Sequence, residues 1–194
     1  MRRSVARAVL AMLMVCASAL GLAGTAAAGT DQGDTDKATY TWHVGDDFLT
    51  NAVGSPDGSQ ATAANGDIIT VEGTGAFTLK KHAASGGGTF KHHVKATDQT
   101  LTGTFQVRKV KSFTSYGNGT PQGTPPNFFG GLLVLAVDIT PDTDPKARIP
   151  AILTVDCLLG SPPAGAQEGI KLKVPGLIDF DTIVPGSATV FVQL

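Results

Sequence analysis

Residues 68–80, IITVEGTGAFTLK, determine the fold class, because apolar and polar side chains alternate along them. Successive side chains of a β-strand point to opposite faces, whereas those of a helix repeat about every 3.6 residues. The alternation is therefore typical of a long strand with one buried face. Two glycines on the apolar face, Gly73 and Gly75, predict a bend, a bulge or the close approach of another layer.

The segments that follow continue the strand pattern. Residues 83–88 are rich in glycine and predict a flexible turn, after which residues 89–96 return as a second strand. Residues 101–113 alternate again, but the pattern changes register at Arg108-Lys109-Val110, which predicts a β-bulge. Residues 115–126 consist mainly of Gly, Pro, Asn and Thr and predict a long surface loop.

Residues 130–140 are apolar on both faces, which is typical of a strand in the middle of a fold. We expect them to pair with residues 149–159 as a long antiparallel hairpin, and short strands to follow at 170–174, 177–180 and 188–194. In total the pattern predicts about eight to ten strands and no helix. The expected fold is all-β, either an antiparallel β-sandwich or a partly closed β-barrel.

The first 28 residues predict a cleaved signal peptide for general secretion. Three early arginines precede an apolar run over residues 8–23, and the small residues 26–28 form a cleavage pattern. We expect residues 29–38 to be a disordered lead-in and residues 39–194 to be a single all-β domain. The expected localisation is secreted and extracellular, with no stable membrane span once the signal is cleaved.

The composition of the mature chain limits its partners. Loss of Arg2, Arg3 and Arg7 leaves 12 basic and 16 acidic residues, a net charge of −4, which gives no electrostatic reason to bind nucleic acid. Cys157 is the single mature cysteine, so no internal disulfide is expected. Because it alternates with apolar neighbours, its thiol is expected to be buried and inert.

No motif in the sequence predicts a catalytic, cofactor or metal site. The chain has no Gly-x-Ser-x-Gly elbow and no twelve-residue calcium loop. His92 and His93 are consecutive on a predicted strand, so they face opposite sides and do not share a metal. We expect His92 to be hydrogen-bonded near the edge of the core, and we expect no cofactor.

Tyr40 and Trp42 are the candidate ligand-binding residues. They lie two apart and therefore on one strand face, where two amphipathic rings can stack on a sugar ring or a peptide. The alternative is that Trp42 fills one end of the core. The two interpretations differ in whether the rings are exposed.

Several segments that contain glycine and aromatic residues resemble segments of other secreted proteins. They are Gly73-Thr74-Gly75-Ala76-Phe77, Gly86-Gly87-Gly88-Thr89-Phe90, Gly103-Thr104-Phe105, Ser112-Phe113-Thr114-Ser115-Tyr116-Gly117, and Ile152-Leu153-Thr154-Val155-Asp156-Cys157 through Glu168-Gly169-Ile170. In this order, over about residues 66–174, the chain resembles a group of uncharacterised secreted proteins of high-GC Gram-positive bacteria. The resemblance implies a secreted domain, and it implies no activity, cofactor or site.

The sequence therefore predicts a non-enzymatic binding or surface module with an extracellular partner, such as a cell-wall polysaccharide or a protein. Two loops, 115–126 and 160–169, are long enough to present a binding surface. One alternative is a small extracellular enzyme that uses His92 and a carboxylate as acid and base. Another is a barrel that encloses an apolar ligand. The first alternative needs His92 to open into a pocket, and the second needs an internal cavity.

Overall fold

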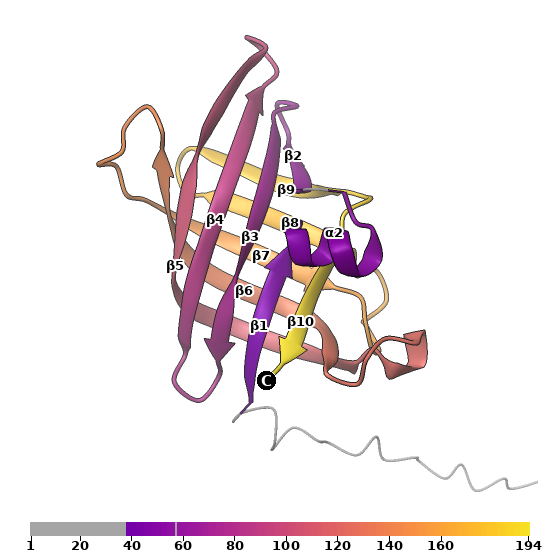
Figure 1. Cartoon of the computed structure of the whole chain (residues 1–194). Coiled ribbons are helices and arrows are strands. Elements are labelled where there is room, and N and C mark those ends of the chain that lie inside the picture. Colours follow the sequence, from indigo (N-terminus) through magenta and orange to yellow (C-terminus); the bar gives the residue numbers. More distant parts are fainter. Residues whose placement is uncertain (1–37, 57) are drawn as a thin grey trace, which may run out of the picture. The chain divides into compact units, whose positions relative to one another are not determined.

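The computed structural model describes residues 38–56 and 58–194, which form ten strands, one short α-helix and one 3-10 helix (Figure 1). The predicted signal peptide and residues 29–37 of the predicted lead-in lie outside the described residues, and Ala38 packs against the core. The elements are β1 (Thr39–Val44), α2 (Asp47–Val53), β2 (Ser59–Ala63), β3 (Ile68–Thr78), β4 (Ala83–Val94), β5 (Gln99–Asn118), η1 (Thr120–Gln122), β6 (Phe128–Pro141), β7 (Ile149–Cys157), β8 (Gly169–Val174), β9 (Ile178–Val184) and β10 (Thr189–Gln193).

The ten strands form one antiparallel sheet that rings round. The order is β1-β10-β6-β5-β4-β3-β2-β9-β8-β7, and two further pairings, β1 with β3 and β6 with β7, join distant parts of that order. Because each added pairing brings an outer strand back onto an inner one, the sheet curls into a partly closed barrel. The all-β prediction and the expected number of strands are confirmed within the described residues.

Strands β1 and β2 both pair with the same edge of β3. The segment that connects them, which we call the excursion, lies outside the sheet and contains α2. β1 pairs with Gly73–Thr78 and β2 with Ile68–Val71. The backbone N–H of Gly58 donates to the carbonyl of Gly45 at 2.9 Å, which closes the base of the excursion. Gly45 has a φ of 51°, a left-handed conformation that glycine adopts without a steric penalty.

The helix α2 corrects the expectation that the domain contains no helix. Asp46 caps its N-terminus by accepting a hydrogen bond from the Leu49 backbone N–H, and Gly54 ends it in the left-handed conformation. Only Leu49 among its seven residues is buried. A helix this short carries no apolar periodicity, so only its two capping residues signalled it in the sequence.

Several local predictions are confirmed. The register between β5 and β6 shifts between Val107 and Lys109, where the bulge was expected, and β6 pairs with β7 over nine residues. Two predictions were wrong. The glycine-rich residues 83–88 form the first half of β4 and pair with β3, so they are not a turn. β5 continues to Asn118, so the expected loop 115–126 begins later. The long β5 bends around the sheet through three such shifts, which keep its later residues paired with β6.

The inside of the sheet is filled by side chains. The void between six core residues is only about 10 Å³, far below the several hundred Å³ of an ordinary ligand pocket. These residues are Val71, Phe90, Phe105, Ile139, Leu153 and Leu172. A Cβ on Gly73 would lie 2.7 Å from the ring of Phe105, which lies two strands away in the same sheet, so this glycine leaves room for the ring. This packed region leaves no room for an enclosed apolar ligand.

Candidate functional site

Tyr40 and Trp42 lie on the inner face of β1 and are fully buried. The Tyr40 ring stacks on Phe77 at 5.2 Å, and the Trp42 indole lies 6.4 Å from the Phe105 ring and donates to the Ser85 carbonyl at 3.4 Å. The strand pattern placed both residues on one face, as expected. That face points into the core, so neither ring is accessible to a ligand, and a packing role replaces the expected ligand platform.

His92 forms a partly buried hydrogen bond with Asp67 at the edge of the core. Its Nε2 lies 2.9 Å from Asp67 Oδ2, and its ring meets Phe180 edge to face at 5.2 Å. Asp67 Oδ1 also accepts the backbone N–H of Lys95 at 3.0 Å, so the pair joins the turn before β3 to the end of β4. Neither residue lines the void between the core residues. The expected hydrogen-bonded role of His92 is confirmed.

The Asp67–His92 pair predicts a loss of stability in acid. The hydrogen bond from His92 is the largest influence on Asp67 and holds the pKa of its carboxyl below the ordinary value of 3.8. A carboxyl whose pKa is lowered by folding stabilises the native state above its ordinary pKa and loses that contribution as the pH falls through the folded pKa. We expect Asp67→Asn to lower the unfolding midpoint at pH 7 and to make progressively less difference as the pH falls from 3.8 through the lower pKa of the folded state. Urea unfolding of the variant and the unmodified chain between pH 7 and strong acid measures the difference between their midpoints. A difference that stays the same in strong acid would contradict the prediction.

One candidate site is a hollow on the outer face of β7 and its neighbours. It has a volume of about 230 Å³, and we call it the Asp156 hollow. Strands β6, β7, β8 and β9 supply its lining, which combines apolar walls with a hydroxyl, a carboxyl and an ammonium group. The lining residues are Leu132, Thr154, Asp156, Gly169, Ile170, Lys171 and Ile183.

The carboxyl of Asp156 is the chemically unusual group in this hollow. Its Oδ1 atom is buried and has no hydrogen-bond partner among the described residues. Burial raises the pKa of Asp156 above its ordinary value, against hydrogen bonds from the Tyr116 hydroxyl and the Gln167 backbone and the charge of Lys171. Burial, together with Asp156, also raises the pKa of Tyr116 to about 12. A buried acceptor without a partner costs about 1–3 kcal/mol.

Glu168 lies beside the Asp156 hollow and has a structural role. Its Oε2 accepts the Leu158 backbone N–H at 2.6 Å, and its Oε1 accepts the backbone N–H and the hydroxyl of Thr189, both at 2.7 Å. Burial is the main reason why the pKa of Glu168 is raised. All its short contacts are within the protein, so it ties the chain after β7 to the start of β10.

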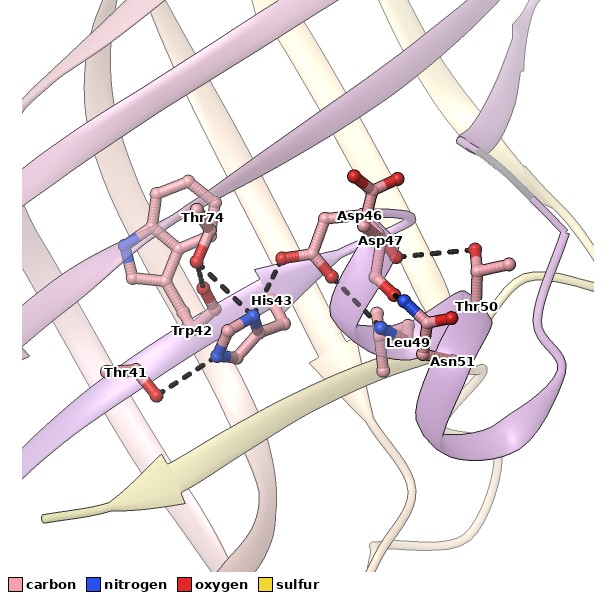
Figure 2. Close-up of polar contacts among 9 residues, drawn as sticks. All are labelled: Thr41, Trp42, His43, Asp46, Asp47, Leu49, Thr50, Asn51 and Thr74. Carbon is pink, nitrogen blue, oxygen red and sulfur yellow. Dashed lines mark hydrogen bonds and ion pairs between the residues drawn. The ribbon is translucent and has the colours of Figure 1, made fainter.

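A second polar cluster lies on the outer face of β1 (Figure 2). His43 Nδ1 lies 2.7 Å from Asp46 Oδ2, and its Nε2 lies 3.1 Å from Thr41 Oγ1. The Phe48 ring stacks on the imidazole at 4.3 Å. We call Thr41, His43 and Asp46 the His43 relay. Its spacing, Thr-x-His-x-x-Asp, is visible in the sequence but was not among the predicted sites.

The Cys157 thiol is buried and burial raises its pKa, in agreement with the expectation that it is inert. Among the described residues, no group of three or more histidine, cysteine and acidic side chains has the arrangement of a metal site. None of the helices in this part of the chain is long and apolar enough to cross a membrane. Comparisons with protein-family models, curated proteins and solved structures find no match to this chain.

Proposed function

We propose that this protein is an extracellular binding module that holds a sugar unit of a cell-wall polysaccharide in the Asp156 hollow. The observation that carries the proposal is an outward-facing hollow of about 230 Å³ whose lining combines the Asp156 carboxyl, the Lys171 ammonium and the Thr154 hydroxyl with apolar walls. The signal-like N-terminus supports an extracellular location, where such polymers occur.

Because the core is filled, we place the binding site on the outer surface. The void among the central core residues is about 10 Å³, whereas the Asp156 hollow is about 230 Å³. A hollow of this size is smaller than the pockets that hold drug-sized molecules, and it suits a single ring of a larger polymer. A polymer that extends beyond the hollow would add contacts along the neighbouring strands.

The lining complements a ring that is hydroxylated at its rim and apolar on its face. Leu132 and Ile183 provide apolar walls, and Thr154 provides a hydroxyl that donates and accepts. The Lys171 ammonium donates, and the Asp156 carboxyl accepts, or also donates when protonated. The raised pKa of Asp156 favours that protonated form more than in an exposed carboxyl. A sugar hydroxyl both donates and accepts hydrogen bonds, so it can pair with both the donors and the acceptors of this lining.

The proposal predicts that the hollow determines retention on cell-wall polysaccharide. We expect the chain without residues 1–28 to bind purified polysaccharide fragments, and Asp156→Asn to weaken this binding about tenfold, because a hydrogen bond to a carboxylate is replaced by a weaker one. Thr154→Val should weaken it in the same direction. Isothermal titration calorimetry measures the affinities, and thermal unfolding of each variant checks that the fold is intact.

A matched control is Asp138→Asn, which changes a carboxylate on the outer face of β6 that pairs with Arg108 at 3.3 Å and does not line the hollow. It should bind like the unmodified chain. Equal affinity of the Asp156 variant and the unmodified chain would exclude the hollow as the site. Retention by a cell-wall protein fraction, with none by the polysaccharide, would exclude a carbohydrate ligand.

A further inference from the structure

The His43 relay has the connectivity of an activated hydroxyl nucleophile: a hydroxyl, an imidazole and a carboxylate in hydrogen-bonded series (Figure 2). The local sequence builds it. Alternation along β1 places Thr41 and His43 on the outer face, opposite the buried Tyr40 and Trp42. The turn at Gly45 then brings Asp46 back beside the imidazole.

Asp46 fixes the orientation and the tautomer of His43. One of its oxygens, Oδ1, accepts the Leu49 backbone N–H at 3.2 Å, so the helix start holds the carboxylate in place. An ionised carboxylate only accepts hydrogen bonds, so the imidazole donates from Nδ1 to Oδ2. In that neutral tautomer Nε2 carries the lone pair and accepts the Thr41 hydroxyl, as a general base must.

The surroundings of Thr41 are apolar. Thr41 pairs with Val192 on β10, and Val192 pairs with Phe128 on β6, so these three side chains form a row on the outer face. The Phe48 ring, which stacks on His43, lies 6.0 Å from the Phe128 ring and is partly exposed. This surface beside the hydroxyl is suited to a short acyl chain.

We propose that Thr41 is an acyl-accepting nucleophile for short-chain esters, with His43 as its general base and Asp46 as the positioning residue. Thr41 Oγ1 attacks the ester carbonyl carbon and its proton passes to His43 Nε2. The bond to the leaving alkoxide then breaks, and the alkoxide takes that proton and departs as an alcohol. Water, deprotonated by His43, then attacks the acyl group on Thr41. The bond from the acyl carbon to Oγ1 breaks, Oγ1 takes the proton back from His43, and a carboxylic acid is released. This activity is independent of the proposed polysaccharide binding.

The test is acylation by p-nitrophenyl butyrate, an ester whose good leaving group needs little stabilisation of the oxyanion. We expect release of nitrophenol together with a butyryl group on Thr41, located by peptide mass spectrometry. Thr41→Val should abolish this modification. His43→Gln should slow it about 100-fold, the lower end of the usual contribution of a general base.

Asp46→Asn separates positioning from folding. Asparagine is as good an N-cap as aspartate, so the unfolding midpoint should change little. When its amide oxygen caps the helix, its NH₂ group faces His43 and favours the tautomer that donates from Nε2, so acylation should slow about as much as in His43→Gln. Asp46→Glu should restore part of the rate if its longer side chain again accepts from Nδ1. Thr89→Val, an exposed hydroxyl on β4, is the control and should react normally.

Two results would overturn the proposal. One is a butyryl group found on lysines or the α-amino group and absent from Thr41. The other is an unchanged rate of Thr41 acylation in His43→Gln when circular dichroism shows that variant to be folded.

Discussion

Replacing Trp42 by alanine is expected to lower the free energy of unfolding by about 4 kcal/mol, within the range for a large buried aromatic residue. The indole is fully buried, lies beside the Phe105 ring and donates to the Ser85 carbonyl. Truncation would leave a cavity in a core whose existing void is about 10 Å³, and it would leave the Ser85 carbonyl without this donor.

Urea unfolding followed by circular dichroism measures this loss. Trp42→Phe keeps most of the buried volume and should cost less than the alanine substitution. Leu177→Ala, which truncates a side chain that is 72% exposed, is the control and should stay within about 0.5 kcal/mol of the unmodified chain. A loss below about 1 kcal/mol for Trp42→Ala would contradict its packing role.

Glu168→Ala is expected to cost about 3 kcal/mol. The substitution removes the acceptor of three short hydrogen bonds from Leu158 and Thr189, two of them from backbone N–H groups. The Thr189 hydroxyl keeps the Asp156 carbonyl as an acceptor at 2.8 Å, whereas each backbone N–H left unsatisfied costs about 1–3 kcal/mol. Release of a buried carboxyl from desolvation offsets part of this cost. The chain after β7 and the start of β10 should therefore lose their shared anchor.

The cost of Glu168→Ala should also depend on pH. Burial raises the pKa of Glu168 above its ordinary value of 4.5, so the folded state holds this proton more tightly than the unfolded state. The linked stability is complete below pH 4.5 and is lost as the pH rises through the folded pKa. The substitution should therefore cost more in acid than at neutral pH, in the opposite sense to Asp67→Asn.

Unfolding curves at several pH values measure how the costs of Glu168→Ala and Asp67→Asn change with pH. Glu72→Ala is the matched control, because this carboxylate is partly exposed and its ion pair with Lys91 is 3.8 Å long. It should change stability by less than about 1 kcal/mol. A cost of Glu168→Ala that equals the control, or that grows as the pH rises, would show that the carboxyl does not anchor this region.

The sequence predicts some features of the candidate sites and not others. The alternation around Tyr40 and Trp42 identified their common face, but not whether that face was the inside or the outside of the sheet. The Asp156 hollow arises where four strands meet, so its lining residues come from segments about 50 residues apart. No spacing in one segment signals such a site. The His43 relay is local, and strand alternation together with the capping pattern at Asp46 was a signal that could have found it.

The sequence by itself determined the all-β class, the long strand at residues 68–78, the bulge in β5 and the hairpin of β6 and β7. These features depend on the two-residue period of side chains and on pairing between neighbouring segments, both of which are local. Only the tertiary structure decided that the sheet rings round, which face is filled, and that Asp156 lies half-buried in a hollow. Those outcomes depend on pairings between distant strands, such as β1 with β10, and on the volume that their side chains fill together.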